Sequence, residues 1–237
     1  MDEPETASVM LDRASAWLDE KLGYHFSDDQ LLCMALTHRS APGWNNERLE
    51  FLGDAILDVV VSEVIYRLRP EASEGVMSRI RASLVKDSTL ARLATSIDLG
   101  EHLVLGPGER RTGGHHRRSI LADALEAIFG AVYLDSGFER AREVILRTYG
   151  DMLETLPESA SLRDPKTRLQ ELLQSRRIGL PAYEVENVTG KAHQQSFEVR
   201  CTVAAVDAST VGHGSSRRQA EQEAATRMLE LLAREPE

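Results

Sequence analysis

The chain has 237 residues, of which 42% are hydrophobic and 28% are charged, and its formal net charge is −10. This composition is typical of a globular protein with one large domain or two smaller ones, and Asp58 and Glu63 interrupt its most apolar run, which excludes a membrane-spanning segment. The acidity argues against a nucleic-acid partner until the charge is divided along the chain. Residues 163–237 hold 11 basic and 11 acidic residues, so the whole excess of acid lies before them.

Apolar residues recur at helical spacing through the first 156 residues, which predicts an all-helical N-terminal part. The first expected helices run from Met10 to Leu22, from a cap at Ser27 to Leu36, and from the residue after Asn46 to the residue before Pro70. Two more helices are expected to begin at caps at Ser73 and Ser88. The last two are expected around Asp123 and from Phe138 to Met152. A glycine-rich basic loop is expected at residues 106–116.

The two cysteines, Cys33 and Cys201, are far apart in the chain and have apolar neighbours. We expect both to be buried thiols, which fits a reducing cytoplasm. The acidic N-terminal residues also lack the apolar stretch of a secretory signal.

The helix after Asn46 carries a stripe of acids on one side. On a helical wheel the acids Glu47, Glu50, Asp54 and Asp58 fall within an arc of roughly 80°. The opposite side is apolar and consists of Leu49, Leu52, Ile56, Val59 and Val60. Like charges at this spacing destabilise a helix by a few tenths of a kcal/mol per pair, so the stripe indicates a bound cation. Gly53 weakens the helix by about 1 kcal/mol relative to Ala, which predicts a close backbone approach there.

A second acid pair, Asp123 and Glu126, lies at i and i+3 in another apolar helix. Two such helices can converge on one hard divalent cation such as Mg²⁺, which prefers oxygen ligands. The alternative is a structural network in which these acids pair with arginines such as Arg48 or Arg79. A di-iron helical bundle would need Glu-x-x-His pairs, which the sequence lacks.

The C-terminal part changes period after a polar linker. Residues 165–177 are helical in pattern, and Phe197, Val199, Cys201 and Val203 alternate with polar residues as in a half-buried strand. Flanking strands are expected at 183–185 and 209–211, and a final helix carries a face of small residues that includes Ala220 and Ala224. The predicted order is α-β-β-β-α.

Four blocks of this sequence resemble bacterial ribonuclease III: ERLEFLGDA at 47–55, EGVMSRIRASLV at 74–85, LGPGE at 105–109 and SILADALEA at 119–127. The C-terminal part resembles a double-stranded-RNA-binding domain, so the resemblance covers nearly the whole chain. It implies a multidomain α plus α+β protein. An all-helical catalytic domain is expected at 8–156, a linker at 157–163 and an α-β-β-β-α binding domain at 164–234.

The resemblance implies an endoribonuclease that cleaves double-stranded RNA through metal-activated water, with Mg²⁺ as cofactor and Mn²⁺ able to replace it. Expected products have 5′-phosphate and 3′-hydroxyl ends with short 3′ overhangs, and expected substrates are precursor rRNA, structured mRNA and tRNA transcripts. A cytoplasmic homodimer is implied, without an organic cofactor or a membrane partner. The rival hypothesis is a non-cleaving binder of double-stranded RNA with the same fold. Such a protein should have lost at least one of four acids, and all four are present: Glu50, Asp54, Asp123 and Glu126.

By the same resemblance, Glu50, Asp123 and Glu126 are metal ligands, and Asp54 and Glu126 are the residues most needed for catalysis. Two further acids, Glu47 and Glu74, match acidic family positions, where they either support the site or serve dimer contacts. Phe51 lies beside the acid stripe. It is either a lid on the site or a knob for another chain, and the family's dimer interface favours the knob.

Three patches match the RNA contacts of the binding domain's family. They comprise Thr167, Gln170 and Glu171, then Lys191 and His193, then Ser215, Ser216, Arg217 and Arg218. A helix N-terminus beside two arginines also favours phosphate in its own right. The family commonly has a lysine where Glu221 stands, so Glu221 is expected to weaken phosphate binding. The basic loop 109–118 is either a solvated loop or a phosphate contact.

Overall fold

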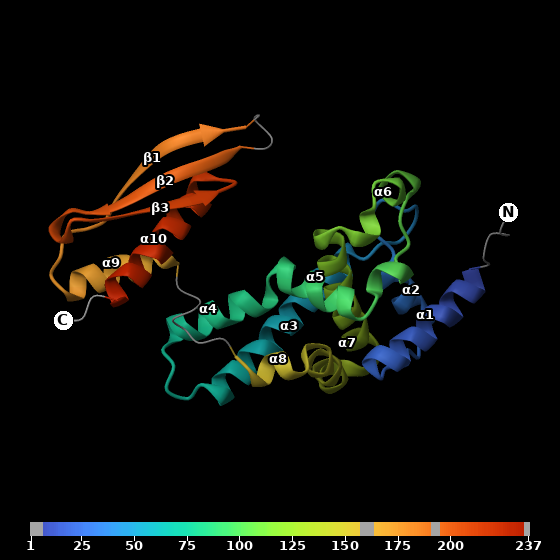
Figure 1. Cartoon of the computed structure of the whole chain (residues 1–237). Coiled ribbons are helices and arrows are strands. Elements are labelled where there is room, and N and C mark those ends of the chain that lie inside the picture. Colours follow the sequence, from blue (N-terminus) through green and yellow to red (C-terminus); the bar gives the residue numbers. More distant parts are fainter. Residues whose placement is uncertain (1–6, 157–163, 191–194, 235–237) are drawn as a thin grey trace. The chain divides into compact units, whose positions relative to one another are not determined.

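The computed structural model describes residues 7–156, 164–190 and 195–234 of the chain. These residues form two compact units, one within residues 1–157 and the other within 158–237 (Figure 1). The first unit is helical, and the second combines a three-stranded antiparallel sheet with two helices. The predicted fold class is confirmed. Among the described residues, no helix combines the length and the apolar character needed to cross a membrane.

The first unit is built around two long helices that pack against each other, α3 and α7. Its helices, including two short 3-10 turns, are α1 (Ala7–Leu22), α2 (Asp29–Leu36), α3 (Glu47–Leu68), α4 (Glu74–Val85), α5 (Asp87–Ser96), η1 (Leu99–His102), α6 (Pro107–Arg111), η2 (Gly114–His116), α7 (Arg118–Tyr149) and α8 (Asp151–Glu154). Helices α2 and α5 also pack on α7, and α4 packs on α3. The middle of α7 is therefore enclosed on several sides, and Leu125, Ile128 and Phe129 are fully buried there.

Two glycines allow α3 and α7 to touch through their backbones. A Cβ atom on Gly53 would overlap the carbonyl oxygen of Glu126 on α7, and a Cβ atom on Gly130 would overlap the carbonyl oxygen of Leu49 on α3. Any larger residue at either position would force the two helices apart. The close approach that the sequence predicts at Gly53 is present.

Helix α7 bends at Gly137, whose φ of 81° and ψ of −177° are not helical. Asp135 lies just before the bend, and its carboxylate accepts the backbone N–H groups of Ser27 and Asp28, each at 3.0 Å, and the hydroxyl of Tyr24 at 2.5 Å. This contact ties the bend to the segment before α2. The two helices predicted around Asp123 and from Phe138 onward are the two arms of α7.

Several local predictions need correction. Asp28, and not Ser27, caps α2, because the Asp28 side chain accepts the N–H of Gln30 at 2.9 Å. Helix α5 begins at Asp87, so Ser88 lies inside it, whereas Ser73 does precede α4 as expected. The basic loop contains two short helical segments, α6 and η2. Local capping patterns are ambiguous where several acceptor residues follow one another.

Two burial predictions are wrong. Cys33 is exposed, whereas Cys201 is buried as expected. On the apolar side of α3, Leu49, Ile56 and Val60 are buried, but Val59 is 56% exposed. The helix is packed on α7 along part of this side only, so apolar character did not by itself specify burial.

The second unit has the order α9 (Pro165–Ser175), β1 (Ala182–Thr189), β2 (Ser196–Val203), η3 (Ala204–Val206), β3 (Ala208–Gly214) and α10 (Arg217–Arg234). Strand β2 is central and pairs antiparallel with β1 and β3. Its alternate residues Val199, Cys201 and Val203 are buried, as the period of two predicts. Gly212 on β3 has no room for a Cβ atom against the backbone of Ala220 and Ala224 on α10. The small-residue face of the last helix therefore packs directly on the sheet.

We predict that Gly53→Ala destabilises the first unit by about 1–3 kcal/mol, because the added methyl group must displace a backbone rather than a flexible side chain. At an open helical position the same change would stabilise by up to about 1 kcal/mol. Gly75→Ala in α4 is the matched control, since its nearest neighbour would be the Arg79 Nη1 atom at 3.5 Å. Chemical denaturation of both variants checks the prediction. A Gly53→Ala protein as stable as Gly75→Ala would contradict it.

Candidate functional site

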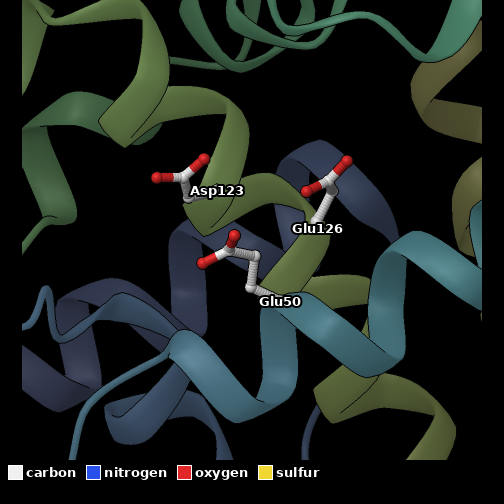
Figure 2. Close-up of side chains that lie close together, drawn as sticks. All are labelled: Glu50, Asp123 and Glu126. Atoms are coloured by element: carbon white, nitrogen blue, oxygen red, sulfur yellow. The ribbon is translucent and has the colours of Figure 1, made fainter.

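Three carboxylates from α3 and α7 lie close together. Glu50 extends from α3, and Asp123 and Glu126 extend from successive turns of α7 (Figure 2). One oxygen of each carboxylate lies within 4.8 Å of one oxygen of the other two, and all three residues are half-buried. The backbone contact at Gly53 brings α3 to the turn of α7 that carries Glu126. The helix crossing thus creates a cluster from acids that are more than 70 residues apart in the sequence.

Asp54 lies one turn beyond Glu50 on α3 and is exposed. It is not part of the group of three, although its charge is the first of the carboxylates that raise the pKa of Glu126. The next acid of the stripe, Asp58, has its Oδ1 atom 3.8 Å from the Nε atom of Arg81 on α4. Among the described residues, the arginines that pair with the acid stripe are Arg81, at Asp58, and Arg39, at Glu47, rather than the Arg48 or Arg79 of the structural alternative.

The protein environment opposes ionisation of every acid in this cluster. Burial and the neighbouring carboxylates raise the pKa of Glu126 from 4.5 to about 8. Burial also raises the pKa of Glu50, with a further contribution from Asp123, and the pKa of Asp123, with a further contribution from Asp87. Like charges held together in a partly dry site repel each other, and a bound cation removes that repulsion.

The donor set fits a hard divalent cation. All three groups offer carboxylate oxygens, which Mg²⁺ and Mn²⁺ prefer over nitrogen or sulfur. The site is only half-buried, so an ion there could keep several of its waters, as Mg²⁺ usually does. We regard Glu50, Asp123 and Glu126 as a candidate metal centre on the basis of this chemistry.

The two supporting acids of the sequence hypothesis are not among the three clustered carboxylates, although Glu47 lies beside them, since its charge adds to burial and Asp123 in raising the pKa of Glu50. Glu47 is exposed at the start of α3, with its Oε1 atom 3.4 Å from Arg39 Nη1. Glu74 begins α4 and accepts the Ser78 hydroxyl at 2.7 Å. It lines a separate cavity of about 440 Å³ together with Tyr66 and other residues of α3 and α4. Neither acid belongs to the cluster of three among the described residues.

An open cavity of about 720 Å³ adjoins the cluster and holds residues that the sequence did not single out. Glu50 and Asp123 line it on one side, and it is completed by His38, Arg39, Ser40, Asn45, Asn46, Glu47, Glu109, Arg117, Ser119 and Ile120. Glu109 and Arg117 come from the basic loop and pair with each other at 2.6 Å. The loop therefore lies beside the clustered acids, a placement that the sequence did not decide.

Asp87 is a further residue near the cluster that sequence reasoning missed. It is the first residue of α5, and its charge raises the pKa values of both Asp123 and Glu126. An acid in the first turn of a helix is common, because it interacts favourably with the helix dipole. The sequence therefore gave no sign that Asp87 is near the cluster.

Phe51 is an exposed aromatic residue on α3. Its exposed fraction is 80%, and Trp44 and Leu134 are 77% and 55% exposed. Trp44 and Leu134 also line a cavity of about 690 Å³ with Leu31, Met34 and Leu52, among other residues. Within the part of the chain that the structure describes, the surface thus offers both a largely exposed aromatic side chain and a mainly apolar hollow.

In the second unit, most of the predicted RNA-binding residues lie at the surface. Thr167, Gln170 and Glu171 are exposed on α9, and Arg217 and Arg218 are exposed in the first turn of α10. The Ser216 hydroxyl accepts the N–H of Gln219 at 3.3 Å, and the Ser215 hydroxyl donates to the Gln219 side chain at 2.6 Å. These serines cap α10. Lys191 and His193 lie outside the described residues.

Two family models match the chain: Ribonuclease-III-like over residues 28–153, and Double-stranded RNA binding motif over residues 165–232. Ribonuclease 3 of Vibrio cholerae is 56% identical over 215 residues, which cover 91% of this chain and 96% of that protein. Ribonuclease 3 of Nitrosococcus oceani is 54% identical over 222 residues, which cover 93% and 95%.

Solved structures agree with the fold of the first unit. A nuclease domain of ribonuclease III from Campylobacter jejuni is 46% identical, with a TM-score of 0.55, and the match covers 56% of this chain and 93% of that one. A second structure of that domain is 43% identical, with a TM-score of 0.56, and covers 60% and 96%.

Fold, acid cluster and similarity together define the class of protein: a helical nuclease domain joined to a double-stranded-RNA-binding motif. The chain belongs to the ribonuclease III family and is an endonuclease. The resemblance found in the sequence is confirmed.

We predict that Glu126→Gln stabilises the metal-free protein at high pH. The pKa of Glu126 is about 8 in the folded protein and ordinarily 4.5. The folded state therefore binds more protons than the unfolded state in this window, and stability is lost as pH rises from 4.5 to about 8. Above about pH 8, Glu126→Gln should melt about 5 °C higher than the unsubstituted chain.

Calorimetry in a chelator, at about pH 5 and about pH 9, measures this effect. The exposed Glu139 on the second arm of α7 provides the control, since Glu139→Gln removes a charge far from the cluster. Identical pH dependence in the Glu126→Gln protein and the unsubstituted chain would contradict the prediction. Added Mg²⁺ should stabilise the unsubstituted chain more than the variant, because it binds the charged carboxylate.

Proposed function

We propose that this endonuclease cleaves double-stranded RNA with Mg²⁺ as its cofactor. The observation that carries the proposal is the convergence of Glu50, Asp123 and Glu126 in a nuclease domain that is joined to a double-stranded-RNA-binding motif. The binding motif alone does not account for the acid cluster, because binding RNA needs no group of carboxylates that repel one another. Mn²⁺ takes the same oxygen ligands and should replace Mg²⁺.

In this proposal Glu50, Asp123 and Glu126 hold the ion. When bound, the ion would lower the pKa of a water nucleophile and stabilise negative charge on the leaving 3′ oxygen. Asp54 lies next to the cluster and is exposed, so its carboxylate is available to the substrate side of the site. Burial and the neighbouring Asp58 raise the pKa of Asp54 above its ordinary value. We assign Asp54 and Glu126 as the residues most needed for catalysis.

We propose supporting roles for Glu47 and Glu74. Glu47 holds Arg39 beside the cavity that adjoins the cluster, and so can orient this cation toward a phosphate. Glu74 lies in a different cavity, and its position suits a dimer contact better than a role in metal binding. The basic loop contributes Arg117 to the cavity wall, which supports its phosphate-contact alternative.

Hydrolysis in this manner would leave 5′-phosphate and 3′-hydroxyl ends with short 3′ overhangs. Precursor rRNA, structured mRNA and tRNA transcripts are the proposed substrates, since all contain duplex segments. We propose a cytoplasmic location, where such transcripts occur and where the two unpaired cysteines would stay reduced. The proposed domain bounds are 8–156 for the catalytic domain, 157–163 for the linker and 164–234 for the binding domain.

The second unit would bind the duplex by its shape, its 2′-hydroxyls and its phosphates. One set of contacts comes from the exposed face of α9 with Thr167, Gln170 and Glu171. Another comes from the first turn of α10, where free N–H groups, Ser215, Ser216 and two arginines favour a phosphate. Lys191 and His193 complete the proposed set.

We propose a homodimer with Phe51 in its interface. The exposed Phe51 ring and the apolar hollow beside Trp44 and Leu134 are suited to each other, and a two-fold dimer pairs the same patch with itself. The similar nuclease domain from Campylobacter jejuni shows structural flexibility in a region involved in dimer formation, which supports a dimer of this domain. Each subunit would then cut one strand of the duplex.

We predict that Glu126→Gln and Asp54→Asn each reduce cleavage of a long RNA duplex by roughly 10²–10⁴-fold while leaving duplex binding within about twofold. Binding is measured in Ca²⁺, whose larger and looser coordination shell should allow binding without efficient cleavage. Glu139→Gln is again the control and should cleave normally. Parallel loss of binding and cleavage would contradict this assignment, and full cleavage without any divalent metal would contradict the proposed cofactor.

We predict that Phe51→Ala shifts the protein from dimer to monomer without lowering its unfolding temperature as a monomer. The ring is 80% exposed, so it contributes little to the core of its own chain. Truncating a well-packed phenylalanine typically costs about 3–5 kcal/mol, which is enough to dissociate many dimers at dilute concentration. Light scattering measures the change, and cleavage of both strands should fall more than binding.

Leu180→Ala provides the control, because Leu180 is also large and apolar, is 62% exposed and belongs to the second unit. It should leave the dimer intact. A Phe51→Ala protein that remains fully dimeric and active would exclude Phe51 from the interface.

A further inference from the structure

Glu221 is a buried acid at the start of α10. Only 9% of the residue is exposed, whereas its neighbours Arg217 and Arg218 are exposed. An ionised carboxylate is stable in such a place only if cations or donors pair with it. The partners of Glu221 therefore decide what it does.

The two carboxylate oxygens of Glu221 bind two different cations, one on α9 and one on its own helix, α10. Lys166 Nζ, in the first turn of α9, lies 2.5 Å from Oε2, and Arg217 Nε, in the first turn of α10, lies 2.8 Å from Oε1. Burial raises the pKa of Glu221, but the hydrogen bonds from Lys166 and Arg217 outweigh burial and hold this pKa below its ordinary value. The carboxylate thus stays ionised and bridges the two helices.

The bridge leaves the outer end of Arg217 available. Glu221 engages only the Nε atom, the Arg217 side chain is 63% exposed, and its two terminal nitrogens have no partner among the described residues. Arginine can use one N–H for an internal anchor and still offer a fork of donors to a phosphate. Arg218 is held differently, with its Nη2 atom 3.9 Å from Asp164.

We propose that Glu221 is a positioning residue for duplex RNA: it fixes the Arg217 guanidinium by Nε so that the terminal nitrogens face a phosphate, and it locks the first turn of α10 to the first turn of α9. The inference rests on the proposed RNA contact of Arg217. It opposes the expectation from sequence that an acid at 221 simply weakens phosphate binding. With both oxygens paired and the side chain 11% exposed, Glu221 presents little charge to the RNA.

The test is Glu221→Gln in the full chain, with the affinity for duplex RNA measured in a chelator to prevent cleavage. The duplex should exceed the span of one binding domain, which is about 16 base pairs. Removing a negative charge near phosphates would by itself tighten binding, whereas losing the anchor weakens it. We expect duplex binding to weaken roughly five- to tenfold. The slope of log K against log salt concentration should decrease by about the amount that one phosphate contact contributes. Unchanged or tighter binding would overturn the proposal.

A double-mutant cycle separates positioning from a general effect on the fold. Arg217→Ala should weaken binding strongly in the unsubstituted chain and little further in the Glu221→Gln chain, because its anchor is already gone. Equal losses in both backgrounds would overturn the proposal. Arg218→Ala should cost the same in both, since Arg218 pairs with Asp164. Glu230→Gln, which removes an exposed charge from the same helix, should change affinity by less than about twofold.

A second variant keeps the proposal testable if Glu221→Gln fails to fold. Arg217→Lys lies at an exposed position and keeps the charge, but a lysine cannot hold Glu221 and offer a separate fork to a phosphate. It should bind RNA as weakly as Arg217→Ala. Native affinity in Arg217→Lys would overturn the proposal. If the unsubstituted chain failed to bind duplex RNA at all, the proposed function itself would be wrong.

Discussion

The backbone contact between α3 and α7 at Gly53 and Gly130 sets the geometry on which the first unit depends. Helices that pack through side chains usually keep their axes about 8–10 Å apart, and removing the Cβ atoms at a crossing lets the backbones meet. Because helices are stiff, fixing this one crossing also fixes the acids one turn away. Glu50 on α3 and Glu126 on α7 are neighbours for this reason, and α2, α4 and α5 support the crossing by packing on α3 or α7.

This arrangement holds several carboxylates close together inside a well-packed helical unit, where their ionisation is unfavourable. Burial and the charges of nearby carboxylates, including Asp87, raise the pKa values of Glu50, Asp123 and Glu126, so the fold would be more stable if these residues were neutral. The apolar sides of the same two helices provide the opposing stabilisation, with Leu125 and Ile128 fully buried. Strain of this kind at a site, supported by a well-packed surrounding structure, is what a metal-dependent catalyst requires.

The second unit solves a different electrostatic problem. It has no net charge over residues 163–237, and the two arginines at the start of α10 are already paired with acids. Pairing does not prevent them from binding RNA, because an arginine held through one nitrogen still offers others. In the role proposed for it, Glu221 therefore determines where the Arg217 guanidinium points more than how much charge the surface carries. The charge of the whole chain, −10, gives no indication of this interface.

The sequence alone determined the helical period, the acid spacing on each helix, the close approach at Gly53 and the α-β-β-β-α order, since each follows from residues within a few positions of one another. The motifs at 47–55 and 119–127 then pointed to the family. The resemblance to that family also named Glu50, Asp123 and Glu126 as a set, although no local pattern brings the three together. Only the tertiary structure showed that their carboxylates lie close to one another, that Glu74 lies outside the cluster, and that Asp87 lies close enough to influence it. It also decided that Cys33 is exposed. These features depend on how helices distant in the chain cross, and a crossing angle is set by packing on both partners, which no local pattern encodes.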